Sequence, residues 1–310
     1  MTDKEKREVR EEKILQELKK RCPGAEVGFY NRYKTNDVKE RIVHLRNPKS
    51  NTGLHLTEPK EDDQVDDMLS VAVSAYENLS EDDFQEVEQF AEYYIARQSL
   101  FVYLLDPDKN RHYLKNAVTA PYIEGLVKVY ALRVRKEGRE GMTLVTKDLM
   151  DTWGRTIPEI DRDAMDGLRL IGCFAEPIEE HLRKMVAEML GYETKIEPGI
   201  HLEQGYPRLS VCSTVTHFKG AGVIMLPEIR KGLYEKIGKY YILPSSINEV
   251  IILPKTEDVT LNDINSLKDM VQDINGNEVA PDEVLSDRVY EYDPLYDRIR
   301  VAGWTEGGRA

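Results

Sequence analysis

The sequence predicts an α+β fold in which mixed or antiparallel sheets pack against helices, with a compact α/β module at its C-terminal end. Short runs of alternating apolar and polar residues recur between turn residues, which is typical of half-buried strands. Longer segments with capping residues and helical apolar spacing lie between these runs. The stretch 221–302 contains both patterns in close succession. At 41% hydrophobic and 32% charged residues, the 310-residue chain can fill a core beneath a charged surface.

The N-terminal segment predicts a helix followed by strands. Thr2 can cap a helix that runs to about Arg21, because Pro23 and Gly24 follow it. The alternating segments 27–33 and 40–46 predict a hairpin, and 53–57 a short third strand.

An acidic region then extends from Pro59 to Glu92. Two helices explain it, since Ser80 followed by Asp83 forms a cap pattern and acidic first turns favour the helix dipole. Solvated helices are the simplest interpretation. The alternative is a decoy for a nucleic-acid-binding partner, because dense carboxylates can imitate phosphates. The net charge of −13 disfavours generic binding of nucleic acid by this chain.

The central segments leave more than one structure open. Residues 99–106 form a strand or a buried helix end, and residues 124–136 a helix or a pair of strands. Thr146 and Gly154 are the predicted cap and stop of a short helix. The segment 178–190 predicts a helix with its apolar stripe inward and with His181 on the polar, solvent-facing side.

The last third predicts alternating strands and helices. The expected elements are strands at 209–218 and 221–226, a helix from Pro227 to Gly238, strands at 240–243 and 249–253, a helix at 261–274, and a final strand pair at 288–293 and 298–302. We divide the chain into an N-terminal α+β region with acidic helices (1–120), a C-terminal α+β module (121–304) and a loose tail (305–310).

No complete catalytic, cofactor or metal-binding motif is recognisable, so the sequence predicts neither a cofactor nor a metal site. A Cys212–His217 pair is disfavoured, because an odd spacing within one strand places side chains on opposite faces. The most polar loop between apolar strands offers Ser245, Ser246, Asn248 and Glu249 as a candidate interaction loop, although ordinary turn chemistry explains the same residues.

Cysteine usage and hydropathy indicate a cytoplasmic protein with no membrane association. The cysteines Cys22, Cys173 and Cys212 are odd in number and far apart, so reduced thiols are expected. No signal peptide is evident, and no uncharged apolar run approaches the ~20 residues that cross a bilayer.

The segments YYILPSSINEVIILP and APDEVLSDRVYEYD carry a resemblance to a known family. Together with GVIMLPEIRKGLYEKIG, and more weakly TLVTKDLMDTWG, they resemble the uncharacterised bacterial family catalogued as domain of unknown function 5688. The similarity is strong over about 221–302 and patchy upstream. The chain keeps an alanine of the family at Ala164 but has Gly167 where the family usually has asparagine. The resemblance implies a bacterial source and supplies no activity, cofactor or site residue.

The favoured hypothesis is therefore a non-catalytic, cytoplasmic bacterial accessory or regulatory protein that acts by binding an unknown protein partner. The alternative is a hydrolase-type enzyme with an unrecognised polar cleft. In that case His217, Arg230, Ser245 and Glu249 would converge in one pocket.

Overall fold

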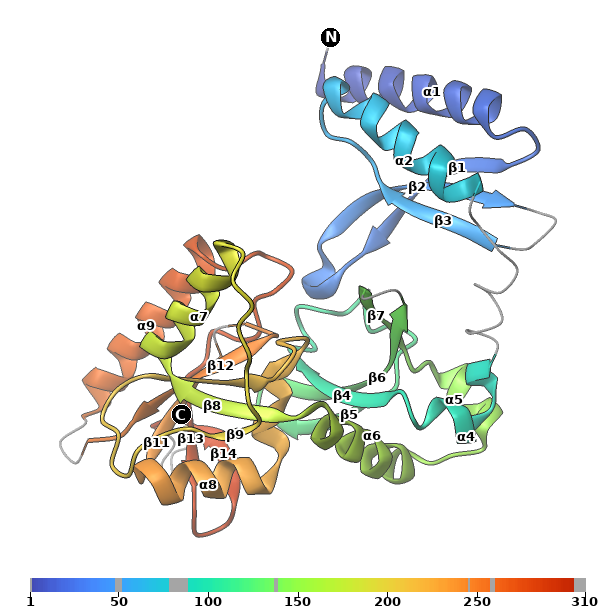
Figure 1. The fold of residues 1–310 in the computed structure, drawn as a ribbon. Coiled ribbons are helices and arrows are strands. Elements are labelled where there is room, and N and C mark those ends of the chain that lie inside the picture. Colours follow the sequence, from blue (N-terminus) through green and yellow to red (C-terminus); the bar gives the residue numbers. More distant parts are fainter. Residues whose placement is uncertain are drawn as a thin grey trace. The chain divides into compact units, whose positions relative to one another are not determined.

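The computed structural model confirms the α+β class (Figure 1). It describes residues 2–47, 52–77, 89–136, 139–244, 246–256 and 260–303. The predicted cap at Ser80 and the tail 305–310 lie outside these ranges. Two compact units divide the chain, Met1–Ile95 and Ala96–Ala310, and each is described by itself.

The N-terminal unit is a three-stranded antiparallel sheet with two helices on one face (Figure 1). Its elements are α1 (Asp3–Arg21), β1 (Glu26–Tyr33), η1 (Thr35–Asp37), β2 (Lys39–Asn47), β3 (Thr52–Thr57), η2 (Asp62–Gln64), α2 (Val65–Glu77) and η3 (Gln89–Ala91). The short helix α4 (Tyr93–Ala96) spans the boundary between the two units. Thr2 caps α1 as predicted, and the hairpin and third strand form as expected. Ile14 and Leu18 of α1 and Leu69 of α2 pack on Val43 and Leu45 of β2, which makes the core of this unit.

Part of the acidic region is paired with basic residues of α1. Asp62 lies 3.1 Å from the guanidinium of Arg10, and Asp66 lies 4.0 Å from the ammonium of Lys13. These are exposed carboxylates, so each pair contributes little to stability.

The C-terminal unit begins with a four-stranded antiparallel sheet. Its elements are β4 (Leu100–Leu105), β5 (Thr119–Ile123), β6 (Leu126–Lys136) and β7 (Arg139–Leu144), followed by α5 (Lys147–Trp153) and α6 (Ile157–Ile171). The segments 99–106 and 124–136, for which the sequence allowed two structures, therefore form the strands β4 and β6. The expected division at residue 120 falls inside β5, whereas the compact units divide after Ile95, because β4 and β5 both pair with β6.

Close packing of α6 on β4 explains Gly167. A Cβ atom at this position would lie 1.8 Å from the carbonyl oxygen of Leu100, so no side chain fits here. The asparagine that the resemblance led us to expect could not replace Gly167 unless the helix moved away from the strand.

A seven-stranded sheet follows, in the order β14-β13-β11-β12-β10-β8-β9. Its elements are β8 (Cys173–Pro177), α7 (Ile178–Met189), β9 (Gly199–Ile200), β10 (Ser210–Thr214), η4 (Gly220–Met225), α8 (Pro227–Ile237), β11 (Tyr240–Leu243), β12 (Glu249–Pro254), α9 (Leu261–Asn277), β13 (Tyr290–Asp293) and β14 (Arg298–Val301). The pairs are antiparallel except for β8 with β9, so the sheet is mixed. Helices α7 and α9 lie on one side of this sheet and α8 on the other (Figure 1).

Two expectations for this unit are wrong. Residues 221–226 are not a strand, because they lie almost entirely in the buried 3₁₀ helix η4. Helix α7 is turned the opposite way from the prediction: its apolar residues Leu182, Val186 and Met189 are 52%, 55% and 81% exposed, whereas His181 is 3% exposed. The polar side of α7 faces the sheet because a buried carboxylate there requires partners.

No helix in the described ranges is both long enough and apolar enough to cross a membrane.

Candidate metal centre

Three neighbouring strands of the seven-stranded sheet direct side chains to the face that α7 covers. Phe174 of β8 and Glu249 of β12 both pair with Ser213 of β10. Residues in register across a sheet point to the same side, and so does Glu176, two positions beyond Phe174. Strand alternation thus brings two carboxylates and an aromatic ring beneath α7.

Two residues on one face of helix α7 contact the buried carboxylate of Glu176. His181 and Lys184 are three positions apart and so lie on the same side of the helix. The Nδ1 atom of His181 lies 2.9 Å from Oε1 of Glu176, and the ammonium of Lys184 donates to Oε2. Burial disfavours ionisation of Glu176, but the hydrogen bonds from Lys184 and His181 outweigh it and lower the pKa of this carboxyl.

The ionised carboxylate determines the tautomer of His181. An ionised Glu176 only accepts hydrogen bonds, so Nδ1 of His181 carries the proton. In a neutral imidazole held in this way the lone pair is on Nε2, where it can bind a ligand. A carboxylate that orients a histidine in this way is common behind metal-binding imidazoles.

His217 enters the same space from the turn after β10. Its ring centroid lies 5.0 Å from that of His181, and its Nδ1 atom lies 4.0 Å from Oε2 of Glu249. Phe174 packs against both imidazoles, stacked on His181 and edge-on to His217. The backbone of His217 is left-handed, with φ of 56°, a strained conformation that is enriched at functional sites.

His181, His217 and Glu249 together form what we call the His–Glu cluster. Each offers one ligand atom, and the three atoms lie within 4.8 Å of one another. Ligands at ~2.1 Å from one tetrahedral ion are about 3.4 Å apart, so small side-chain rotations would close the set. Burial, reinforced by His181, lowers the pKa of His217 and favours the neutral imidazole that metals bind. Burial, reinforced by the nearby carboxylate of Glu283, raises the pKa of the Glu249 carboxyl.

A profile of the family of unknown function (DUF5688) matches residues 7–294. The chain belongs to this family. The match confirms the resemblance, both where it is strong at the C-terminal end and where it is patchy upstream. Comparison with curated proteins and with solved structures finds no match.

The candidate interaction loop of this DUF5688 chain contributes one candidate metal ligand, Glu249, and a neighbouring residue, Asn248, that fixes the position of the loop. Glu249 belongs to the cluster, whereas Ser245 lies outside the described residues. The backbone N–H of Asn248 donates to Oγ of Ser246. The side-chain amide of Asn248 accepts from the backbone of Lys219 and donates to Glu283. Asn248 therefore ties the turn that carries His217 to the strand that carries Glu249.

Arg230 is engaged elsewhere. Its guanidinium donates to the carbonyls of Ile224 and Met225 and to the carboxylate of Asp297, 3.0 Å away. It braces η4 and the turn between β13 and β14. The structure thus brings together His217 and Glu249 from the predicted set, and places Arg230 in a separate set of contacts.

Sequence reasoning missed His181 and Glu176. The helical pattern placed His181 toward solvent because five apolar residues occupy another face of α7. The available signal was the spacing of His181 and Lys184 directly after a strand that contains Glu176. The Cys212–His217 parity argument does not apply, since β10 ends at Thr214.

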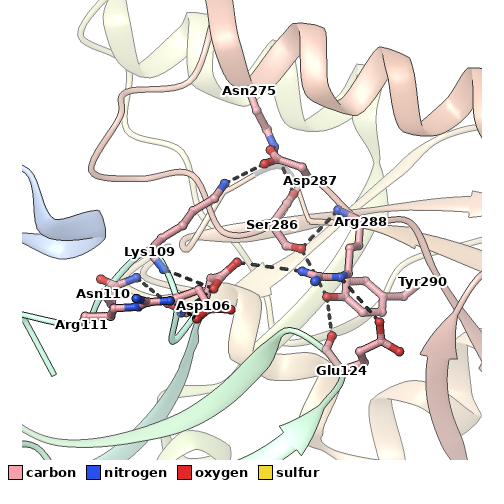
Figure 2. A network of polar contacts seen from close by, with 11 residues as sticks. Asp106, Lys109, Asn110, Arg111, Glu124, Asn275, Ser286, Asp287, Arg288 and Tyr290 are labelled. Atoms are coloured by element: carbon pink, nitrogen blue, oxygen red, sulfur yellow. Dashed lines mark hydrogen bonds and ion pairs between the residues drawn. The ribbon is translucent and has the colours of Figure 1, made fainter.

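A second polar cluster, the Arg288 network, lies between the four-stranded sheet and the loop before β13 (Figure 2). Its residues share contacts with several neighbours at once; they are Asp106, Lys109, Asn110, Glu124, Asn275, Ser286, Asp287, Arg288 and Tyr290. Lys109 pairs with Asp287 at 2.7 Å, and Asn275 donates to the same carboxylate at 2.9 Å. Tyr290 donates to the carbonyl of Glu124 at 3.0 Å. These contacts link loop residues of the four-stranded sheet to residues of α9, of β13 and of the loop before β13, so this network joins the two sheets of the unit, although Oδ1 of Asn275 has no hydrogen-bond partner among the described residues.

Proposed function

We propose that this protein binds a divalent transition-metal ion of the zinc class through His181, His217 and Glu249. The observation that supports the proposal is the convergence of these ligand atoms within 4.8 Å, with the buried carboxylate of Glu176 behind His181. Two imidazoles and one carboxylate suit zinc and its neighbours, whereas calcium and magnesium prefer oxygen ligands alone.

Metal binding is consistent with either function considered from the sequence. An accessory or regulatory protein would use the ion to hold a surface or to sense metal supply. A hydrolase-type enzyme would need a free coordination position on the ion. Three unpaired, buried cysteines support a reducing, cytoplasmic location in a bacterium. The acidic decoy stays a prediction, since residues 78–88 lie outside the described ranges.

The test is titration of the full-length chain with zinc. We expect isothermal titration calorimetry of EDTA-treated protein to show one saturable site. His217→Ala and Glu249→Gln should each weaken binding by more than the roughly 10–100-fold typical of an outer-shell partner. His201→Ala is the matched control, because this exposed histidine bonds a carbonyl outside the cluster. Absence of a saturable site, or equal affinity in all three variants, would refute the proposal.

A further inference from the structure

We infer that an ion held by the His–Glu cluster activates a water molecule for hydrolysis of a neutral acyl bond, an ester or an amide. This inference rests on the metal binding proposed above. It adds a reaction and a class of substrate.

The first support is the asymmetric burial of the ligands. The side chain of His181 is 4% exposed, whereas those of His217 and Glu249 are 35% and 30% exposed. An ion among them would be anchored on the buried side and open to solvent on the other. Catalytic zinc sites keep three protein ligands and a water molecule, whereas structural sites are closed by four protein ligands.

The nearby cysteines do not close the site. Cys173 and Cys212 precede Phe174 and Ser213 by one position, so they point to the opposite face of the sheet. Burial raises the pKa of Cys173 to about 12 and also raises that of Cys212. Both are neutral thiols, whereas zinc binds thiolates. Within the described ranges the candidate ligands are His181, His217 and Glu249, so an ion held by them would keep its fourth coordination position for water.

The second support is the charge around the ligands, which favours an uncharged substrate. His217 lies in the field of His181, Glu188 and Glu176, and Glu249 lies in that of His181 and Glu283. Among the described side chains bonded to these carboxylates, Lys184 is a cation, and it is already paired with Glu176. With a divalent ion bound, the positive charge of the ion and Lys184 does not exceed the negative charge of the carboxylates of Glu176, Glu188, Glu249 and Glu283. Phosphoryl-transfer sites instead surround their anionic substrate with arginine, lysine or a second metal ion.

The reaction balances without a further reactant. The ion lowers the pKa of its bound water toward about 7, so a proton is released to solvent near neutral pH. The resulting hydroxide oxygen bonds to the acyl carbon, and the carbon–oxygen or carbon–nitrogen bond breaks. The leaving alcohol or amine takes up a proton, and a carboxylic acid is the second product. His181, His217 and Glu249 hold the ion throughout.

The experiment uses full-length protein treated with EDTA and reloaded with zinc. The probes are p-nitrophenyl acetate as a neutral ester and p-nitrophenyl phosphate as an anionic one, with calorimetry on the same samples. We expect zinc-dependent cleavage of the acetate at least about 100-fold above zinc alone, the low end for a positioned catalytic group. Cleavage should be lost in His217→Ala and Glu249→Gln and retained in His201→Ala.

Each contrary outcome identifies what fails. Saturable zinc binding without acetate cleavage above that of free zinc overturns the hydrolytic inference and leaves metal binding intact. Cleavage of the phosphate but not of the acetate overturns the assignment to acyl bonds. Failure to bind zinc overturns both proposals. Equal cleavage by wild type and the two ligand variants shows that the activity arises outside the His–Glu cluster.

Discussion

The His–Glu cluster and the Arg288 network belong to the same compact unit but differ in how their polar groups are satisfied. In the network, Lys109 and Asn275 both reach Asp287, and Tyr290 reaches a backbone carbonyl (Figure 2). In the cluster, the imidazole of His217 and the carboxylate of Glu249 face each other at 4.0 Å, beyond hydrogen-bond distance. The network is held by hydrogen bonds between the two sheets, although Oδ1 of Asn275 has no partner among the described residues and Arg288 lies 4.0 Å from Asp106 and from Glu124. The cluster instead brings three potential ligand atoms within 4.8 Å of one another, which suits it to binding an ion.

The two regions differ in what lies against a nearby glycine: backbone and a short side chain at the cluster, and the end of a long side chain at the network. An alanine substitution at each glycine tests this difference. A Cβ at Gly220 would lie 2.0 Å from Oγ of Ser213 and 2.5 Å from the carbonyl oxygen of Asn248. Because backbone must move, we expect Gly220→Ala to lower the free energy of unfolding by about 3 kcal/mol. Zinc affinity should fall with it. Urea denaturation followed by circular dichroism, together with calorimetry, measures both effects.

The counterpart is Gly125→Ala at the Arg288 network. Gly125 has φ of 79°, and a Cβ there would lie 2.3 Å from Nη1 of Arg288, the mobile end of a side chain. We expect a smaller loss of stability, about 1–2 kcal/mol, with unchanged zinc affinity. Loss of zinc binding in this variant would show that the two regions are coupled.

The support behind the ligands is tested by Glu176→Gln. The amide keeps the size of the side chain but removes the charge that fixes the tautomer of His181. We expect zinc affinity to fall by roughly 10–100-fold, because an outer-shell carboxylate raises the basicity of the ligand. Calorimetry measures the affinity, and a circular dichroism melt serves as the folding control. Unchanged affinity would mean that Glu176 has a packing role alone.

For Asn275→Ala we expect the free energy of unfolding to fall while zinc affinity stays the same. The amide of Asn275 donates to the carbonyl of Ser286 at 3.0 Å and to Asp287 at 2.9 Å in a buried position. Its removal leaves the buried carbonyl without this donor and should cost about 1–2 kcal/mol of stability. Zinc affinity should not change. A variant that keeps wild-type stability in urea would show that the network does not join the sheets.

The smallest effect concerns pH. Burial of Asp287 opposes ionisation, but the hydrogen bonds from Asn275 and Lys109 outweigh it and lower its pKa below the ordinary 3.8. A lowered folded pKa contributes stability that is present above the unfolded value and is lost as the pH falls through the folded one. Wild type should therefore exceed Asp287→Asn by less than about 1 kcal/mol above pH ~4, since the pair is partly exposed and screened. The difference should shrink in melts recorded below pH ~4, and a constant difference would contradict the ion-pair assignment.

Local signals in the sequence predicted many elements well because their causes are local. Thr146 caps α5 and Gly154 ends it in a left-handed conformation, as expected. Pro227 begins α8, and Gly238 ends it. Helix α9 begins at Leu261 as predicted but continues through Asn275 to Asn277. A buried side-chain contact of Asn275 outweighs its weak helix propensity there.

Prediction failed where a contact distant in sequence decided the outcome. Helical periodicity cannot show that the polar face of α7 covers a buried carboxylate, so it placed His181 outward. The segment 221–226 reads as a strand from its apolar residues alone, yet close contacts of Gly220 with Ser213 and Asn248 accompany the 3₁₀ turn.

The sequence alone determined the α+β class, the family and most helix ends, because caps, glycines and apolar periodicity act within a few residues. Only the tertiary structure assembled His181, His217 and Glu249, which come from a helix, a turn and a strand separated by more than thirty residues at each step. Strand register places Glu249 and Phe174 on either side of Ser213, and the buried charge of Glu176 turns His181 inward. These are long-range interactions, which local residue patterns do not record.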